Sequence, residues 1–428
     1  MGRAMLLLVS GLVIISGIIQ MNNTKRTELL PARTVDKYYE QQARNISGSL
    51  IDKAINNLLI DMEWEGTVTT NDNYSGEGTL TTSADPDNPL DEYKVLLTSS
   101  ASYGGYTAET QVLMSRDSFS KYSYFTDAEK LPDGQEIWWW DGDEVTGPMH
   151  TNGTFRMSGS PTFNGFVSSP NDWVGYTGNE DSNNPDVRHG SDTPQFNEGA
   201  NFNLNRTRDL PSEEQLTELA NLASTGGITF AEDAELEFYI DSNEGFVKRI
   251  KDSTETSYQL SDYNSIISVT GQAKVKGIVK GQVTLHSTQK IEIMGDILYD
   301  TSPIDDVNST DLLGLVSEGN VIIDKDAHTD NGSSNLTIHA SIMALNTSFE
   351  VEDWSSGDPR GTLNLLGGII QKNRGPVGTF SGGSVKSGFT KSYVYDDRLL
   401  QTIPPSFPRE SIFSIVYWKD NPVVKSDN

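Results

Sequence analysis

The sequence predicts a mainly β protein in which a long N-terminal helix leads into an α+β head and then a right-handed β-helix-like solenoid. Three observations predict this fold. An uncharged apolar segment opens the chain and is followed by an apolar stripe at helical spacing. Short strands separated by Gly, Asn and Asp come next. Short β-branched strands then repeat from Ser265 to Leu366.

Residues 1–24 are expected to form a membrane anchor or a leader. No charged residue occurs from Ala4 to Met21, which is marginal for a span of roughly 20 residues and also fits the apolar region of a signal peptide. A retained anchor is favoured because no small-x-small cleavage site follows Ile19. The side chains expected in the membrane are Ala4, Met5, Leu6, Leu7, Leu8, Val9, Leu12, Val13, Ile14, Ile15, Ile18 and Ile19.

Charge alone does not fix the orientation of this segment. Arg3 precedes it, whereas Lys25, Arg26, Arg33 and Lys37 follow it, so a plain positive-inside count places the body in the cytosol. An extracytoplasmic body is favoured by analogy, because solenoid patterns of the kind found further on are typical of surface proteins.

Residues 25–61 are expected to form an amphipathic stem helix. Pro31 should kink or break the helix between anchor and stem. The apolar stripe recurs every three or four residues. It consists of Val35, Tyr39, Ala43, Ile46, Leu50, Ala54 and Leu58.

Residues 62–136 are expected to form an antiparallel β head, with the stem helix across one face. The segments 65–70, 93–98 and 110–114 alternate as strands do, and polar turn residues separate them.

Residues 137–400 are expected to form the solenoid, with a loop at 171–203 and a helix at 211–223. The rungs recur at roughly 20–25 residues, within the range of short solenoid repeats, and a β-sandwich is the alternative. Residues 401–428 form a closing segment, whose strand at 413–418 either caps the solenoid or pairs with the head sheet.

Composition limits the function. The chain has 428 residues, a net charge of -28 and no cysteine. Such a surface repels phosphates, which disfavours nucleic acid as a partner, and it suits a halophilic source. Without cysteine there is no disulfide and no thiolate metal site, which favours a bacterial or archaeal envelope protein over a eukaryotic secreted one.

Three consecutive tryptophans form the most distinctive local motif. In a strand, Trp138 and Trp140 share one face and Trp139 takes the other. An exposed aromatic face would stack on sugar rings or seat a partner, and packing between the head and the first coil is the alternative, which is favoured. Trp138 and Trp140 are therefore the candidate ligand-binding residues.

Acidic and basic side chains give weaker signals. Asp141, Asp143 and Glu144 are weak candidates for a Ca²⁺ site, although a solvated turn is the favoured interpretation. His150, which lies in a Gly/Asn turn, is expected to have a structural role. No nucleophile-elbow, zinc-protease or P-loop motif occurs, so no catalytic residue and no cofactor are expected.

Together these features resemble the PilX-like, type IV pilin-related envelope proteins, some of which carry a β-solenoid on a pilin-like stem. The resemblance is carried by the helix continuing through 35–58, the segment 147–153, the rungs, and the segment 395–399 with the prolines at 404–405. It implies a class III leader, a membrane-embedded first helix and a head displayed on or near a pilus. The sequence differs from the family pattern in placing Gly2 before Arg3 and in having no acidic residue in the apolar segment.

The expected function is that of a non-catalytic, membrane-anchored or pilus-associated cell-surface protein with a structural or adhesive role. Its expected partners are the membrane, pilin-like or envelope proteins, and glycans. The alternative is a β-helix protein that binds or degrades polysaccharides.

Overall fold

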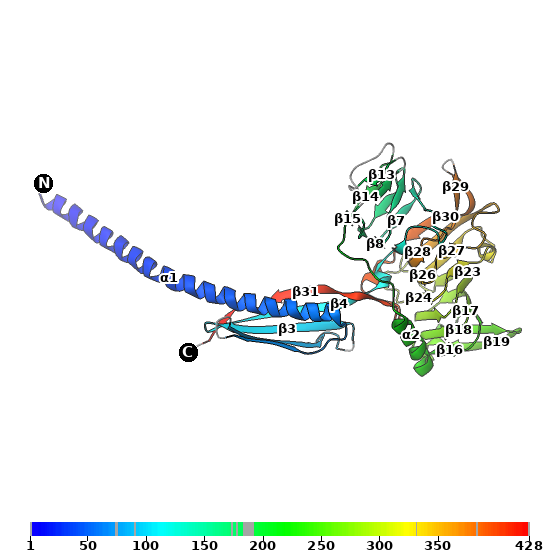
Figure 1. Ribbon diagram of the computed structural model, residues 1–428, viewed down its shortest axis with the longest axis horizontal. Helices are drawn as coiled ribbons and strands as arrows, with labels where there is room; N and C mark the ends of the chain where they lie inside the picture. The colour runs from blue at the N-terminus through cyan, green and yellow to red at the C-terminus, as the bar shows by residue number, and fades with distance from the viewer. Residues whose placement is uncertain are drawn as a thin grey trace. The chain divides into compact units, whose positions relative to one another are not determined.

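The chain divides into two compact units in the computed structural model. Met1–Arg116 with Ile412–Asn428 form the first unit, and Asp117–Ser411 form the second (Figure 1). The structure describes residues 2–72, 76–89, 91–172, 174–176, 179–182, 192–330, 332–381 and 384–426, with the backbone alone at 2–12, 23, 25–32, 72 and 179–182. The predicted mainly β class is confirmed.

The first unit begins with helix α1 (Gly2–Ile60), which has 59 residues and continues through Pro31. Of the two outcomes expected at Pro31, a kink or a break, the break does not occur, because a proline inside a helix removes one hydrogen bond without necessarily ending the helix. Within the described residues, no helix is long and apolar enough to span a membrane. Seven of the twelve expected membrane side chains, from Ala4 to Leu12, lie outside the described side chains.

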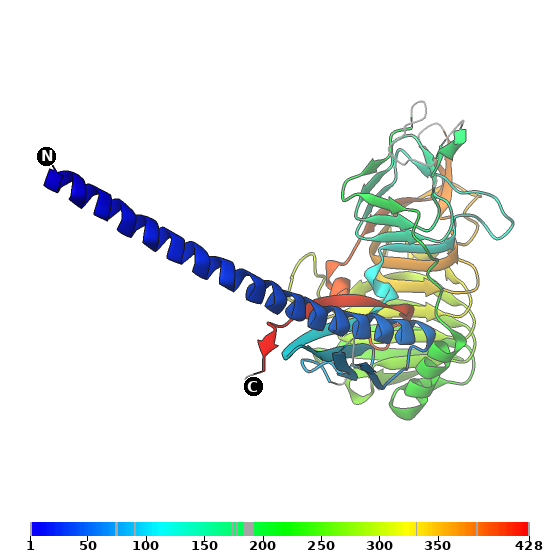
Figure 2. The same cartoon turned by 60° about the vertical axis from the view of Figure 1, so that its left-hand side comes forward.

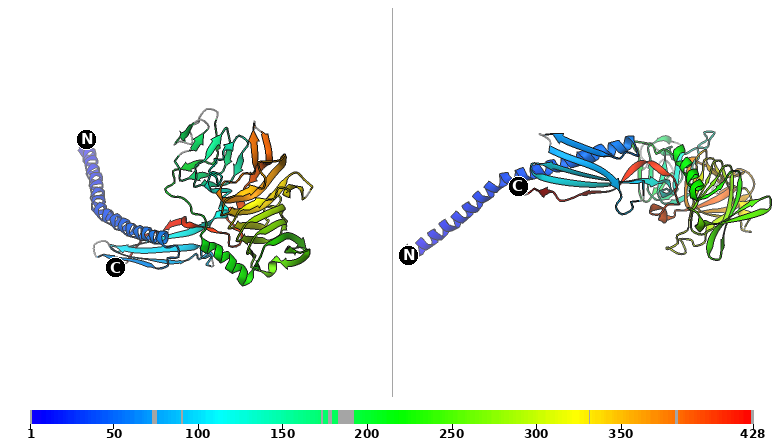
Figure 3. Two further views of the ribbon diagram at one scale, coloured as in Figure 1. Left: turned by 45° about the vertical axis from the view of Figure 1, so that its right-hand side comes forward. Right: turned by 90° about the horizontal axis from the view of Figure 1, so that it is seen from below.

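The predicted stripe on the stem is the face that α1 buries. Ala43, Leu50, Ala54 and Leu58 are buried against the sheet of the first unit, whereas Val35 remains exposed. The sheet has the order β1-β2-β3-β4-β31, and α1 lies along one face of it (Figure 3). The bounds are β1 (Thr67–Asp72), β2 (Gly76–Ala84), β3 (Lys94–Tyr103), β4 (Tyr106–Ser118), β31 (Arg409–Asp420) and β32 (Val424–Lys425).

Strand β31 decides between the two expectations for the closing segment. It neighbours β4 in this sheet, and β32 pairs with β4 as well, so the segment joins the head sheet. The head ends at Arg116 rather than at residue 136, because β5 (Tyr124–Ala128) belongs to the parallel ladder of the second unit.

The second unit is a stack of short parallel strands. Neighbouring strands along the stack pair in register, so equivalent residues form columns. One column of buried side chains points into the core and crosses the whole stack. It consists of Ile267, Leu285, Leu315, Ile342, Ile369, Tyr124, Met149 and Val167.

The stack does not follow the order of the chain. Its lower part runs from β16 (Ile228–Phe230) up to β28 (Pro359–Asn373), and β28 then pairs with β5, the first strand of the unit. From β5 the stack continues through the early strands to β15 (Ala200–Phe202), as the colours in Figure 2 show. The first strands of this unit in the sequence therefore stack beside the last ones.

The remaining elements of the upper part are short. They are η1 (Phe119–Lys121), β6 (Trp139–Trp140), β7 (Glu144–Thr146), β8 (Met149–Thr151), β9 (Arg156–Ser158), β10 (Thr162–Asn164), β11 (Val167–Ser169), β12 (Val174–Tyr176), β13 (Asn179–Ser182) and β14 (Gln195–Phe196). Residues 195–202, predicted as loop, extend the parallel ladder because β14 and β15 pair with β10 and β11. The rest of the predicted loop lies partly outside the described residues.

Helix α2 (Glu213–Gly226) matches the helix predicted at 211–223 to within three residues at either end. Ser212 caps it by accepting a hydrogen bond from the Gln215 N–H, and two glutamates occupy its first turn. Leu216, Leu219 and Ala223 pack on the outer face of the ladder, beside Val316 and Met343. This packing explains why several strands are buried on both faces.

The lower part contains further strands and short 3-10 helices. They are β17 (Ala234–Asp241), β18 (Glu244–Lys251), β19 (Thr254–Gln259), η2 (Leu260–Asp262), β20 (Ile266–Val269), β21 (Ala273–Val279), β22 (Gln282–Ser287), β23 (Ile291–Tyr299), β24 (Leu312–Ser317), β25 (Val321–Ile323), η3 (Ala327–Thr329), β26 (Leu336–Ala344), β27 (Phe349–Val351), β29 (Gly378–Ser381), β30 (Ser384–Val394) and η4 (Asp397–Leu400).

Candidate functional site

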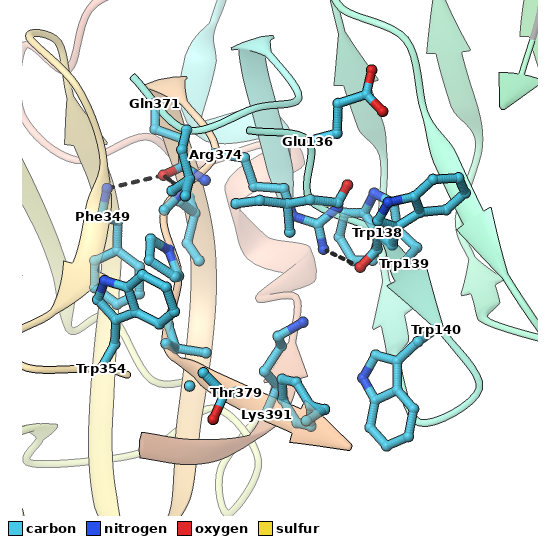
Figure 4. A pocket seen from close by; sticks show the side chains of 18 of the residues that line it. Glu136, Trp138, Trp139, Trp140, Phe349, Trp354, Gln371, Arg374, Thr379 and Lys391 are labelled. Carbon is cyan, nitrogen blue, oxygen red and sulfur yellow. Dashed lines mark hydrogen bonds between the residues drawn. The ribbon is translucent and has the colours of Figure 1, made fainter. Parts of the chain in front are cut away.

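A pocket of about 360 Å³ lies where the early and late strands of the second unit meet (Figure 4). Its volume falls within the roughly 300–1,000 Å³ typical of ligand sites. Residues 124–140 line one part of it and residues 349–393 line most of the rest. The aromatic lining residues are Tyr124, Trp138, Trp139, Trp140, Phe349, Trp354, Phe380 and Tyr393.

Trp139 is the buried centre of this arrangement. Its side chain is 1 % exposed, and its indole N–H donates to Glu129 Oε2 at 3.1 Å. The Arg374 guanidinium carbon lies 3.8 Å from the ring centroid, a close cation–π contact. Trp138 and Trp140 are half-buried, and both line the pocket together with Trp139.

The two flanking tryptophans face different neighbours. Trp138 lies near Arg156, whose guanidinium carbon is 6.0 Å from its ring centroid. The ring centroid of Trp140 is 4.9 Å from that of Phe380, with 37° between the planes. The Trp140 indole N–H is buried and has no hydrogen-bond partner in the part of the chain that the structure describes.

Two buried ion pairs support the pocket. Arg374 Nη1 lies 3.0 Å from Glu129 Oε2, and Lys391 Nζ lies 2.7 Å from Asp143 Oδ1. Burial lowers the pKa of the Lys391 ammonium, and the neighbouring Asp143 carboxylate opposes that shift. Each buried charge is thus compensated by a partner of opposite sign.

The three weak Ca²⁺ candidates are not brought together. Asp143 points inward to Lys391, Glu144 Oε1 accepts from Asn164 Nδ2 at 2.8 Å, and Asp141 Oδ1 accepts from the Ser160 N–H. Asp141 lies in the turn between β6 and β7, and Asp143 and Glu144 are successive residues that face opposite ways. Among the described residues, no group of three or more acidic or histidine side chains is placed to hold a metal ion.

Sequence reasoning missed most of the pocket. Arg374, Lys391, Trp354 and Phe380 lie more than 200 residues after the tryptophan motif. One signal was present in β30. Lys391 lies two residues after Phe389 and two before Tyr393, so the three side chains share one face of the strand. A lysine in such a position indicates a buried cation with a carboxylate partner.

His150 lies in strand β8 and not in the Gly/Asn turn expected from the sequence. The side chain is fully buried in β8, and its ring centroid lies 5.3 Å from that of Phe125. The ring nitrogens lie 2.8 Å from Ser168 Oγ and 3.1 Å from Asn152 Oδ1. Burial lowers the pKa of His150 to about 4.

The buried His150 predicts a loss of stability in mild acid. The unfolded chain takes up the proton near its ordinary pKa of about 6.5, so folding stability falls as the pH drops from there towards 4. Between pH 7 and pH 5 this group alone should lower the free energy of unfolding by about 2 kcal/mol. The His150→Gln variant, measured by urea unfolding at both pH values, should lose that share of the pH dependence. An unchanged pH dependence in the variant would contradict the prediction.

Comparison with known proteins gives a family match and structural similarity to a pilin. The family model described as "Domain of unknown function (DUF4900)" matches residues 98–171. The crystal structure of the competence-associated pilin ComZ from Thermus thermophilus is similar at 12 % sequence identity, covering 90 % of this chain and 97 % of that chain, with a TM-score of 0.37. No curated protein matches the chain.

Proposed function

We propose that this protein is a non-catalytic component of the cell envelope, membrane-anchored or pilus-associated, with a structural and adhesive role. The observation that carries the proposal is the two-part character of α1. The helix packs on the antiparallel sheet through the face that includes Leu50 and Leu58, whereas its earlier part leaves apolar side chains in solvent. The exposed side chains there are Val13, Ile14, Ile15, Ile18, Ile19 and Met21, each at least 55 % exposed.

An exposed apolar helix of this kind needs a partner. Water is an unfavourable surrounding for contiguous apolar side chains, and lipid or the helices of like proteins would cover them. This arrangement supports the resemblance to pilin-related proteins, in which the first helix is membrane-embedded. The body is proposed to lie outside the cytoplasm.

The stack of the second unit is proposed to be a β-solenoid head. Its support is the in-register parallel pairing of successive strands, which buries aligned inward columns as solenoid coils do. In this proposal the residues 117–411 form the displayed body.

The polysaccharide-degrading alternative finds less support in the pocket. Glycoside hydrolysis needs two carboxyl groups placed as acid and as base or nucleophile. Glu136 is the carboxylate among the described lining residues, and it is paired with Arg156. The nearby Glu129 and Asp143 are likewise held as counter-ions of Arg374 and Lys391.

Cell fractionation tests the proposed location. The protein should be found with membranes or sheared surface fibres, and Ile14→Asp with Ile18→Asp should move it to the soluble fraction. Each aspartate at the centre of a membrane helix costs about 2.5–3.5 kcal/mol. Asn22→Asp with Thr24→Asp, which adds the same charge to polar positions, is the matched control and should leave the location unchanged.

Sequencing the N-terminus of the same preparations separates the two modes of attachment. An intact Met1 indicates a retained anchor, and a start at Arg3 or Ala4 indicates leader processing of the pilin type. A wild-type protein found wholly in the cytoplasm would overturn the proposal.

A further inference from the structure

The walls of the pocket carry aromatic side chains from three separate segments. Trp140 and Phe380 lie together on one side, with ring centroids 4.9 Å apart. Trp354 lies on the opposite side, with Thr379 and Lys391 between the two tryptophans (Figure 4). All three aromatic rings are only partly buried, so each keeps apolar surface accessible. Opposed aromatic surfaces of this kind suit a ligand with flat apolar faces.

The same walls offer a hydrogen-bond donor. The Trp140 indole N–H is buried without a partner among the described residues, although buried donors are normally satisfied. In Figure 4 its nitrogen lies on the side of the ring that faces Lys391 and Thr379. A ligand oxygen in the pocket would supply the acceptor that this group lacks.

The charges around the pocket favour an uncharged ligand. Arg374 is paired with Glu129, Lys391 with Asp143, and Arg156 with Glu136, so three cations are balanced by three anions. Arg374 already covers the face of Trp139, which leaves no free aromatic face there for a cationic ligand. An anionic ligand would also enter against a net charge of -28.

We propose that this pocket is a binding site for a neutral saccharide. A pyranose ring has an apolar C–H face that packs on an indole ring, and its hydroxyl oxygens accept hydrogen bonds at the edge. Trp140 and Trp354 supply the stacking surfaces, and Trp140 Nε1 donates to a ring or hydroxyl oxygen. The inference rests on the adhesive part of the proposed function and names its ligand class.

Titration of the full-length protein with neutral hexasaccharides tests the proposal. Cello-, malto- and chitohexaose are the probes, hexagalacturonate is the charged comparison, and a proline-rich peptide is the alternative occupant. Isothermal titration should give saturable binding of at least one neutral probe with a Kd below about 1 mM. Hexagalacturonate and the peptide should bind at least tenfold more weakly.

Variants then locate the site. Trp140→Ala and Trp354→Ala should each weaken binding at least tenfold, whereas Trp140→Phe, which keeps a ring but lacks the N–H, should fall between them and wild type. Trp418→Ala is the matched control, because Trp418 is a tryptophan 44 % exposed outside the second unit, and its affinity should stay within twofold. Equal urea midpoints for all variants establish that they are folded.

Three outcomes overturn the saccharide site: no neutral probe binds, the peptide binds in preference, or both alanine variants bind as wild type does. Fractionation answers the separate question of location. A cytoplasmic protein that binds a neutral probe would overturn the envelope proposal alone, and an envelope protein that binds none would overturn the saccharide site alone.

Discussion

Arg374→Met should lower the free energy of unfolding of the second unit by about 3–5 kcal/mol, because it leaves a buried carboxylate without its counter-ion. Arg374 is 3 % exposed and Glu129 is 4 % exposed, and their side chains meet at 3.0 Å. The substitution also removes the guanidinium from the face of Trp139. Urea denaturation followed by tryptophan fluorescence measures the loss.

A double-mutant cycle separates the lost ion pair from lost packing. Glu129→Gln in the Arg374→Met background removes the stranded charge and still accepts from Trp139, so it should restore a substantial part of the stability. Arg206→Met, at an exposed arginine of the same unit, is the matched control and should change stability by no more than about 0.5 kcal/mol. A cost below about 1 kcal/mol for Arg374→Met would show that the pair is not buried as described.

Gly367→Ala should destabilise the stack by about 3 kcal/mol or more. Gly367 has a φ of +139°, a backbone conformation that residues with a Cβ rarely adopt. A Cβ at this position would also overlap the carbonyl oxygen of Ala340, its partner on the neighbouring coil. The ladder would have to open there, and the change is expected in the urea midpoint and in the far-ultraviolet circular dichroism.

Gly48→Ala is the opposing control in the first unit. Gly48 lies inside α1, and a Cβ there has nothing within 4 Å, so the alanine should be neutral or should stabilise by about 0.5–1 kcal/mol. If the two glycine variants changed the free energy of unfolding by the same amount, the positive φ of Gly367 and its close approach to Ala340 would not explain the effect of Gly367→Ala.

The sequence was informative wherever a local pattern decided the structure. The 3.6-residue stripe identified the face of α1 that contains Leu50 and Leu58. The proline at 211, the acids after it and the spacing of the leucines at 216, 219 and 222 identified α2. The rungs beginning at Ser265 predicted short buried strands, and these pair in parallel. Each of these features depends on residues close together in the chain.

Features that depend on distant pairing were not predictable in the same way. No residue near Tyr124 in the sequence indicates that its strand pairs with the strand of Ile369. The predicted head therefore extended to residue 136, twenty residues beyond its end at Arg116. Many parallel pairings are compatible with a set of similar short strands. The periodicity of the sequence does not show which strand pairs with which, so it does not predict their order in the stack. The continuation of α1 through Pro31 likewise depends on more than the local preference of proline.

The site shows the same division. Alternation in an extended segment predicted that Trp139 faces away from Trp138 and Trp140. Trp139 is indeed the most buried of the three, but all three line the same pocket. Arg374 directly follows β28, which pairs with β5, and Lys391 lies in β30, which pairs with β28 and β7. The sequence therefore could not predict that these two cations contribute to the pocket, because their position depends on the pairing of distant strands.

The order of coils has a consequence for the timing of assembly. During synthesis, residues 124–140 leave the ribosome long before residues 349–393. The pocket cannot form until the later residues are available. Until β28 arrives, the edge of β5 is an open parallel edge, which is a hazard for pairing with other chains. Because the pocket exists only when that edge is closed, any molecule that binds there favours the closed stack by mass action. A ligand that occupies the pocket would thus also stabilise the folded second unit.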